Sequence, residues 1–220
     1  MLTINNLSKV FGSVTVLDGL SATFNEGQVH VVIGANGAGK STLFRCLLGL
    51  EDHEGLIQWR GRPLRPADGL VAAVFDRTPF YPRLTGMQNL RVLAAGADAG
   101  PHQYLAPSLL GARVRTYSHG QRKRLALMMA FNSPAEIVVL DEPSLGLDAA
   151  GMREMVADVR RMAGERTVIV ADHHVEWYQG VADTATVVSS GGAHQVILDA
   201  GKGGEELVEL RDASAPPVAR

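Results

Sequence analysis

The sequence predicts an α/β fold in which a mainly parallel sheet follows an antiparallel β region and is interrupted by inserted helices. Three continuous apolar runs, VHVVIG, EIVVLDE and TVIVAD, end in glycine or an acidic residue, which is typical of parallel strands buried on both faces. Helical stretches separate these runs, and strands that alternate with helices indicate a sheet whose ligands lie at the carboxyl ends of its strands. The apolar content of 46% is ample for one large core.

The N-terminal region and the helices around the sheet follow from the spacing of apolar residues. Between Leu2 and Phe24 the apolar residues mostly alternate with polar ones, which predicts antiparallel strands with one solvent-exposed face. Helices are expected over Ser41–Leu50, after the first apolar run, and over Gly151–Ala163, before the third. This order of elements predicts an antiparallel β-subdomain joined to a parallel α/β core.

The middle of the chain, residues 76–132, has a different character. Helical stretches are expected over Leu90–Ala95 and Arg122–Phe131, and no convincing strand lies between them. We therefore interpret this segment as an inserted helical subdomain. The predicted core comprises residues 1–75 and 133–210, and the core and the insertion together form a single domain over residues 1–210.

Two further features are predicted near the C-terminus. The stretches TATVVSS and HQVILD flank Gly191 and Gly192, a pair that suits a tight hairpin because both positions can adopt positive φ. Residues 211–220 are mostly small or polar and contain proline, so we expect them to form a disordered tail.

Composition limits the compartment and the partners that we expect. Lys and Arg number 21 and Asp and Glu 23, so the formal charge of −2 gives no electrostatic reason to expect a nucleic-acid partner. The single cysteine, Cys46, excludes an internal disulfide, suggests a reducing compartment and is interpreted as a small core residue. No apolar run approaches the roughly 20 residues of a membrane helix, and the N-terminus lacks the pattern of a secretory signal. We therefore expect a cytoplasmic chain without a membrane span.

A phosphate-binding motif follows the first apolar run. The stretch GANGAGKST, Gly34–Thr42, fits G-x-x-x-x-G-K-[ST] at every fixed position and opens a predicted helix. In such a P-loop the backbone N–H groups surround the β-phosphate, Lys40 contacts the β and γ oxygens, and the Ser41 hydroxyl ligates Mg²⁺. The alternative is a glycine-rich turn with an incidental lysine. We predict nucleoside triphosphate binding by Gly34, Asn36, Gly37, Ala38, Gly39, Lys40, Ser41 and Thr42.

An acidic pair ends the second apolar run. A triphosphate site needs a carboxylate for Mg²⁺ and a group that orients the attacking water. Asp141, at the end of the predicted strand, suits the metal, and Glu142 beside it can point toward water as a general base. The alternative is an acidic cap on a helix or a turn. Together with the P-loop, the pair predicts a P-loop NTPase core.

The stretch YSHGQ indicates which class of P-loop protein this is. It precedes the basic helical run RKRLALMMAF and lies about twenty residues before VVLDEP. This arrangement resembles the LSGGQ signature of the ATP-binding cassette (ABC) family. The resemblance implies that Ser118, Gly120 and Gln121 contact the ATP of a second subunit, whose γ-phosphate the N-terminus of the following helix attracts. The alternative is a helix start that is capped by Ser118.

The resemblance to the ABC family extends over nearly the whole chain. It implies that Phe11 stacks on adenine and that Asp148, in DEPSLGLD, contacts the opposite monomer. In TVIVADHHVEW the switch histidine of the family matches His173, because Glu176 then keeps the usual spacing, and His174 is the less favoured register. A neutral histidine near the γ-phosphate can act as a hydrogen-bond donor or a proton relay.

Three positions depart from the pattern of the family. His119 replaces glycine and Tyr117 replaces leucine in the signature, which we interpret as tolerable changes. The loop that leads into the helical insertion usually carries a glutamine that contacts Mg²⁺ and water, and Asp76 stands there, since Gln88 is too far along the chain. A carboxylate can ligate Mg²⁺ but cannot donate a hydrogen bond. We therefore assign Ser41, Asp76 and Asp141 to the metal and expect altered hydrolysis or coupling.

The resemblance implies an ATPase subunit of a membrane transporter. Two copies, or this chain and a second, unlike cassette, would close over ATP and drive a separate transmembrane permease from the cytoplasmic face of the membrane. The short insertion and the lack of a regulatory domain after Leu210 favour export. One alternative is a soluble ABC ATPase that acts on ribosomes or DNA, although tandem cassettes, sustained heptads and a basic patch are missing. Another is a small-molecule kinase, which would not explain YSHGQ.

Overall fold

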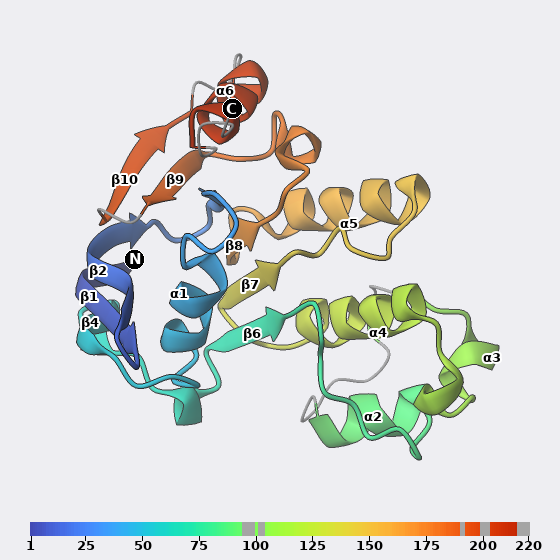
Figure 1. The fold of residues 1–220 in the computed structure, drawn as a ribbon. Helices are drawn as coiled ribbons and strands as arrows, with labels where there is room; N and C mark the ends of the chain where they lie inside the picture. Colours follow the sequence, from blue (N-terminus) through green and yellow to red (C-terminus); the bar gives the residue numbers. More distant parts are fainter. Residues whose placement is uncertain (94–99, 101–103, 190–191, 199–202, 215–220) are drawn as a thin grey trace.

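Two β-sheets form the framework of the protein (Figure 1). The computed structural model describes residues 1–93, 100, 104–189, 192–198 and 203–214. The smaller sheet has the order β2-β1-β4-β5, with β1 (Leu2–Phe11), β2 (Val14–Phe24), β4 (Glu54–Trp59) and β5 (Arg62–Pro63). The larger sheet has the order β10-β9-β3-β8-β7-β6, with β3 (Val29–Ile33), β6 (Val71–Val74), β7 (Ile137–Asp141), β8 (Thr167–Ala171), β9 (Thr184–Ser189) and β10 (Gly192–Ile197).

The larger sheet is mainly parallel, as the three apolar runs predict. Strands β9, β3, β8, β7 and β6 pair in parallel, and β10 is antiparallel to β9 at one edge. Every residue of β3, β7 and β8 is buried, because other elements cover both faces of the sheet. The carboxyl ends of these strands lie at one edge, so the loops that follow them meet there.

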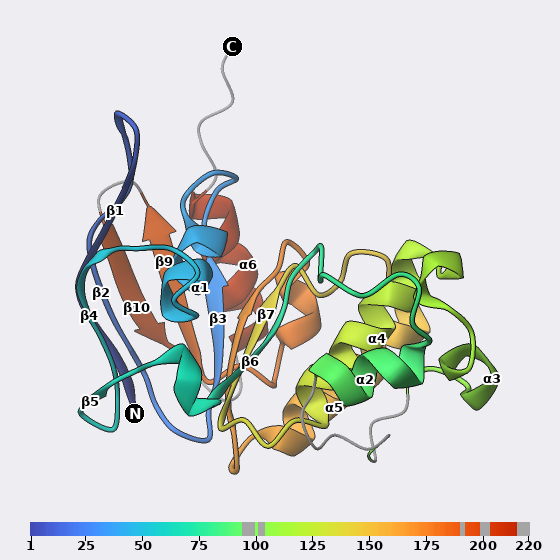
Figure 2. The same cartoon turned by 90° about the horizontal axis from the view of Figure 1, so that it is seen from below.

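The smaller sheet and helix α1 (Lys40–Leu47) cover one face of the larger sheet. Strand β1 pairs antiparallel with β2 and with β4, which confirms the predicted antiparallel N-terminal region. Figure 2 shows α1 between the two sheets, and a shared core joins Ile4 and Leu20 of the smaller sheet, Phe44 of α1 and Val139 of β7. The predicted helix over Ser41–Leu50 thus ends at Leu47.

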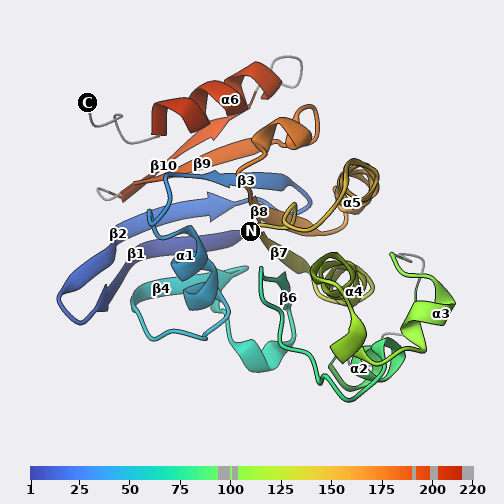
Figure 3. The same cartoon turned by 45° about the vertical axis from the view of Figure 1, so that its right-hand side comes forward.

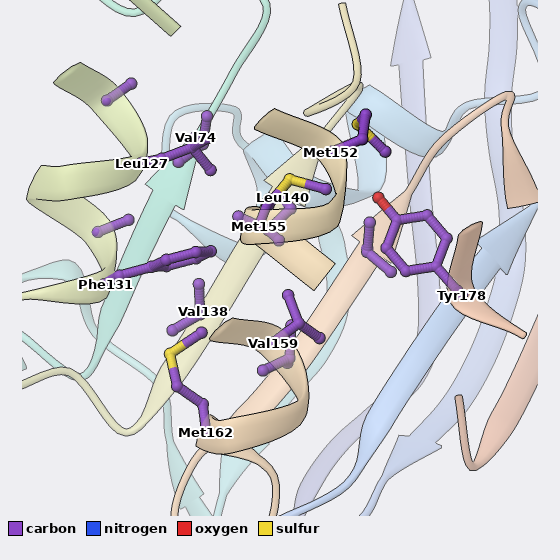
Figure 4. Close-up of a cluster of buried hydrophobic side chains, with 14 of the residues drawn as sticks. Val74, Leu127, Phe131, Val138, Leu140, Met152, Met155, Val159, Met162 and Tyr178 are labelled. Atoms are coloured by element: carbon purple, nitrogen blue, oxygen red, sulfur yellow. The ribbon is translucent and has the colours of Figure 1, made fainter. Parts of the chain in front are cut away.

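Helices α4 (His119–Phe131) and α5 (Ala149–Met162) cover the opposite face. Figure 4 shows the core that they form with β6 and β7, and all of its labelled side chains are buried: Val74, Leu127, Phe131, Val138, Leu140, Met152, Met155, Val159, Met162 and Tyr178. The core around α1 contains none of these residues. Helices α1 and α4 therefore lie on opposite faces of the larger sheet.

The other described helices lie in the insertion, in short 3-10 turns and near the C-terminus. The segment between β6 and β7 contains α2 (Gly86–Leu93), α3 (Pro107–Leu110) and α4, and the 3-10 helices are η1 (Pro66–Asp68), η2 (Val114–Thr116) and η3 (Val175–Tyr178). Helix α6 (Gly203–Ser214) packs beside η3 and β9, as Figure 3 shows. Within the part of the chain that the structure describes, no helix has both the length and the apolar character needed to cross a membrane.

The structure corrects several predicted boundaries. Helix α2 begins at Gly86 instead of Leu90, and α4 begins at His119 instead of Arg122. The C-terminal hairpin is present, but Gly192 pairs with Ser189 within it and so belongs to β10, while Gly191 lies outside the described residues. The expected tail over 211–220 is wrong in its first four positions, because α6 continues to Ser214.

The partly buried guanidinium of Arg166 joins α4 to the sheet. Arg166 precedes β8, and its Nη1 and Nη2 atoms donate to the carbonyl oxygens of Phe131 and Ala130 at 2.9 and 3.2 Å. Its Nε atom donates to the Ala135 carbonyl oxygen at 2.7 Å. These carbonyls belong to the last turn of α4 and to the loop after it, where helix carbonyls lack intrahelical partners. Arg166 therefore fixes the C-terminal end of α4.

We expect Arg166→Met to lower the free energy of unfolding by about 2–4 kcal/mol, because several buried carbonyls lose a charged donor. Denaturant unfolding followed by circular dichroism measures this change. The matched control is Arg160→Met on the exposed face of α5, which should change stability by at most about 0.5 kcal/mol. Equal effects of the two substitutions would show that Arg166 has no special structural role.

Candidate nucleotide site

The P-loop connects β3 to α1, as the motif predicts. Gly37 and Gly39 have φ values of +81° and +100°, which side chains other than glycine rarely adopt. A Cβ atom at Gly34 would lie only 2.6 Å from the Val188 carbonyl oxygen of β9. The backbone of the loop thus needs glycine for two reasons, a left-handed conformation at two positions and a close approach to β9 at the third.

Lys40 is the first residue of α1, and its side chain lies inside the loop. Its Nζ atom donates to the carbonyl oxygens of Gly34 and Ala35 at 2.7 and 3.1 Å, and the residue is only 8% exposed. Burial lowers the pKa of the Lys40 ammonium, while Glu142 and Asp141 oppose this shift. The ammonium therefore occupies the position in which phosphate oxygens can replace the two carbonyls as acceptors.

Ser41 and Asp141 meet across the site. The Ser41 hydroxyl donates to Asp141 Oδ1 at 3.1 Å, which links α1 to the end of β7. Burial raises the pKa of the Asp141 carboxyl, and the hydrogen bond from Ser41 opposes this shift. A hydroxyl and a carboxylate oxygen at this separation suit the oxygen ligands that Mg²⁺ prefers, with further positions left to water and phosphate.

Glu142 follows β7 and faces His173. Glu142 Oε1 lies 3.2 Å from His173 Nε2, whereas His174 Nδ1 contacts Glu176 at 3.1 Å. The other oxygen, Oε2, is buried and has no hydrogen-bond partner among the described residues. Burial, followed by the charge of Asp172, raises the pKa of the Glu142 carboxyl to about 7. A partly desolvated carboxylate beside a histidine has the properties of a general base.

The backbone of Glu142 is in an uncommon conformation. Its φ angle is +49°, a region that costs a non-glycine residue on the order of 1–3 kcal/mol. The Glu142 N–H group donates to the Ala171 carbonyl oxygen at 2.8 Å, so the pairing of β7 with β8 continues past the end of the strand. This contact holds the carboxylate opposite the residues that follow β8.

Asp172 connects the loops after β7 and β8, and our sequence analysis did not find it. Its carboxylate accepts from the Ser144 hydroxyl at 2.7 Å, the Ser144 N–H at 3.2 Å, the His174 N–H at 3.0 Å and the Tyr178 hydroxyl at 3.0 Å. Asp172 is only 4% exposed, and Tyr178 is fully buried. One carboxylate therefore fixes the turn after Glu142 and the turn that contains His173.

The signature stretch begins α4, and its polar groups cap that helix. The Ser118 side chain accepts from the Gln121 N–H at 3.2 Å, and the Gln121 side chain accepts from the Ser118 N–H at 2.9 Å. This capping box is the arrangement that the alternative interpretation of Ser118 expects. It leaves Ser118 exposed at the N-terminus of a long helix, where an anion is favoured.

Contacts within the chain explain why glycine stands at position 120 and how tyrosine is accommodated at position 117. A Cβ atom at Gly120 would lie 2.3 Å from the Gly146 carbonyl oxygen, so glycine is required by packing within the chain, besides any approach of phosphate. Tyr117, which replaces leucine, is buried, and its hydroxyl donates to the Leu109 carbonyl oxygen. A Cβ atom at Gly86 would lie 2.3 Å from that hydroxyl, so Gly86 provides the space that the larger side chain needs.

Asp76 lies beside the signature stretch. Its Oδ1 atom lies 3.6 Å from His119 Nε2, so two of the three departures from the family pattern contact each other. Among the described residues, no group of three or more His, Cys, Asp and Glu side chains could hold a metal ion. Ser41 and Asp141 are in contact with each other, and the assignment of Asp76 to the metal stays a prediction.

The two remaining predicted residues lie on the surface. Phe11, at the end of β1, is 42% exposed, and the Lys9 ammonium lies 4.7 Å from its ring centroid. Its ring is therefore accessible for stacking. Asp148 caps α5 by accepting from the Gly151 N–H at 2.9 Å, and it accepts from Arg124 of α4 at 2.8 Å. The exposed Asp148 thus joins the loop after β7 to the signature helix.

A P-loop after β3, an acidic pair after β7 and a histidine after β8 define a P-loop protein that hydrolyses nucleotides. The family model described as ABC transporter matches residues 17–145. This match covers more than half of the chain, so the protein belongs to the ABC transporter family, whose members are ATP-binding ATPases.

Curated relatives agree with this assignment. The chain is 30% identical over 207 residues to the uncharacterized ABC transporter ATP-binding protein YdbJ of Bacillus subtilis, covering 87% of this chain and 67% of the relative. It is 29% identical to the lantibiotic transport ATP-binding protein SrtF of Streptococcus pyogenes, covering 95% and 94%. It is 33% identical to the cobalt import ATP-binding protein CbiO of Salmonella typhimurium, covering 87% and 78%.

Solved structures share the fold. An ATP-binding subunit of an ABC transporter superposes with a TM-score of 0.80 at 24% identity, covering 96% of this chain and 99% of the other. A dimeric ATP-binding cassette in a post-hydrolysis state, bound to ADP and phosphate, superposes with a TM-score of 0.80 at 18% identity, covering 90% and 99%. At these identities the likeness establishes the fold alone.

We expect Asp172→Asn to lower the kcat of ATP hydrolysis by about tenfold or more. The carboxylate accepts from four donors, whereas an amide has only one acceptor oxygen. The loop that contains His173 should therefore shift and move His173 away from Glu142. The KM for ATP should stay within about twofold, because the P-loop is untouched. Steady-state phosphate release measures both constants. Tyr178→Phe is the control, since it removes only one of the four donors and should have a smaller effect; an unchanged kcat in Asp172→Asn would contradict the assignment.

Proposed function

We propose that this chain is the ATP-hydrolysing subunit of an ABC transporter that closes as a dimer over ATP and powers a separate permease. The proposal rests on the contact of Glu142 Oε1 with His173 Nε2 at 3.2 Å. The two residues lie in the loops that follow neighbouring strands. It supplies the one element that simple nucleotide binding does not need, a base positioned for water. The separate roles of the site residues below belong to this proposal.

Hydrolysis would use the residues around Lys40. A water molecule held by Glu142 attacks the γ-phosphorus and transfers its proton to the carboxylate, while the bond from the γ-phosphorus to the bridging oxygen of ADP breaks. Lys40 stabilises charge on the β and γ oxygens, and His173 donates to the γ-phosphate. Mg²⁺, held by Ser41 and Asp141, would neutralise phosphate charge when bound. Products are ADP and inorganic phosphate.

Dimer formation is supported by the placement of the two phosphate-binding helices. Helix α1 carries the P-loop on one face of the larger sheet, and α4 begins at Ser118 on the opposite face. The exposed start of α4 thus presents a positive helix end that the P-loop of the same chain does not use. A second cassette, identical or unlike, would supply its ATP to Ser118, Gly120 and Gln121 and meet Asp148, while Phe11 stacks on adenine.

The helical insertion is the proposed docking site for the permease. Three of its large apolar side chains are exposed, Tyr81, Val92 and Leu93, and an exposed apolar surface suits a protein partner. We place the chain on the cytoplasmic face of the membrane through this contact. We also propose export as the direction of transport on the shortness of the insertion, although the relatives include proteins named for cobalt import and for lantibiotic transport.

We expect Glu142→Gln to form a stable dimer when ATP and Mg²⁺ are added, because the amide cannot accept the proton of the attacking water and ATP remains between the subunits. Size-exclusion chromatography coupled to light scattering measures the mass. The unsubstituted protein, which turns ATP over, is the control and should remain mainly monomeric under the same conditions. A variant that binds ATP and yet stays monomeric would count against the shared site.

We expect Asp76→Gln to change the ATPase rate, or its stimulation by the permease, by about threefold or more. The amide gains a hydrogen-bond donor that a carboxylate lacks and loses the charge that faces His119. Steady-state ATPase assays with and without the permease in proteoliposomes measure both. Asp68→Asn, an exposed acid in η1, is the control. Identical rates and identical coupled transport would refute a role for Asp76.

A further inference from the structure

Lys123 in α4 is a buried cation that the nucleotide chemistry does not use. The helix opens with the basic run Arg122, Lys123 and Arg124, and the three side chains have different surroundings. Arg122 is exposed, and Arg124 pairs with Asp148 at 2.8 Å. Lys123 is only 3% exposed and points toward the larger sheet. A solvent-exposed basic helix face therefore explains the charge of Arg122 but not that of the buried Lys123.

The Lys123 ammonium contacts two backbone carbonyls that lie far apart in the sequence. Its Nζ atom donates to the Glu142 carbonyl oxygen at 3.0 Å and to the Phe75 carbonyl oxygen at 3.2 Å. Phe75 immediately precedes Asp76, at the point where the chain leaves β6 for the helical insertion. One side chain thus connects the signature helix, the loop that enters the insertion and the residue that holds the catalytic carboxylate.

The charge of Lys123 is compensated by its surroundings. Burying an ammonium group without partners would cost several kcal/mol. Burial disfavours the charged form of Lys123, and the negative charges of Asp76, Asp141, Asp172 and Glu142 oppose that penalty. The cation therefore lies within electrostatic reach of these four carboxylates, and its removal would leave their mutual repulsion without that compensation.

The contact with Glu142 acts on a backbone that needs support. Glu142 has a φ angle of +49°, a conformation that persists only where the surroundings fix it. Its N–H group is held by the Ala171 carbonyl oxygen at 2.8 Å, and its carbonyl oxygen is held by Lys123. The two peptide groups of Glu142 are thus fixed from opposite sides, one by β8 and the other by α4.

We infer that Lys123 is a positioning residue that transmits the position of the signature helix to the backbone of Glu142. A shift of α4, caused by nucleotide at its N-terminus or by a partner on the insertion, moves the Lys123 ammonium. The movement weakens or strengthens the hydrogen bond to the Glu142 carbonyl oxygen and so changes the orientation of the Glu142 carboxylate. This inference rests on the proposed ATPase function. It adds a direct connection within one subunit between the surface that meets a second ATP and the base that hydrolyses the first.

The test compares substitutions of Lys123 with a matched change one residue away. Lys123→Met removes the donor and the charge at similar length, Lys123→Arg keeps both, and Arg122→Met makes a similar change on the exposed side. We expect Lys123→Met to lower the kcat for ATP by about tenfold or more with KM within about twofold. Lys123→Arg should keep at least about a third of the wild-type kcat, and Arg122→Met should be near wild type.

A second measurement does not depend on activity. Hydrogen–deuterium exchange of the amides in residues 142–147 should be about tenfold faster in Lys123→Met than in Arg122→Met, because local opening of this loop becomes easier. If thermal melting shows that Lys123→Met is unfolded, Lys123→Gln, which keeps a neutral donor, replaces it in both assays. The same slowing of catalysis and faster exchange are expected, with a smaller magnitude.

The outcomes separate this inference from the proposed function. A Lys123→Met variant, or its Gln replacement, with wild-type kcat and wild-type exchange would overturn the inference, as would an equal loss in Arg122→Met. A loss confined to KM would assign Lys123 to nucleotide binding and overturn it as well. Faster exchange in a protein whose wild type hydrolyses no ATP would support the connection while refuting the proposed function.

Discussion

The site depends on the parallel pairing of β7 with β8. Asp141 lies opposite Ala171 in the register of the two strands, and the Glu142 N–H continues the ladder to the Ala171 carbonyl oxygen. This register places the residues after each strand side by side, so that Glu142 meets His173. Because successive residues of a strand point to opposite faces, a slip of one residue would turn the acidic pair around. Hydrogen bonds from Ser144 and His174 to Asp172 join the loops that follow the two strands in this register.

Strain at the site is concentrated in Glu142 and is offset by its neighbours. The residue combines a left-handed backbone with a buried oxygen that has no partner among the described residues, and each feature costs free energy. Asp172 fixes the turn after Glu142 and the turn that contains His173, and Lys123 donates to the Glu142 carbonyl oxygen. An unpaired oxygen in a fixed position is available for a water molecule, which is what a general base requires.

The sequence was sufficient where a signal lies in one continuous stretch. The buried strands and the P-loop followed from local patterns, and the resemblance to the ABC family implied His173 in preference to His174. In the structure it is His173 that contacts Glu142. Asp172 and Lys123 were missed because their partners are backbone groups, or side chains distant in sequence, that only the fold brings near. Asp76 was assigned to the metal by its position in a motif, and the fold adds a contact with His119 that the motif does not reveal.

If the site is shared between two cassettes as proposed, the two faces of the larger sheet explain why one chain would provide only part of it. The P-loop helix α1 and the signature helix α4 are separated by the sheet, and packed layers lie about 10 Å apart. The exposed, capped start of α4 is a complete helix end that favours an anion, and the proposed function assigns that anion to the ATP of a second cassette. Lys123, five residues along that helix, lies where movement of this end would reach Glu142.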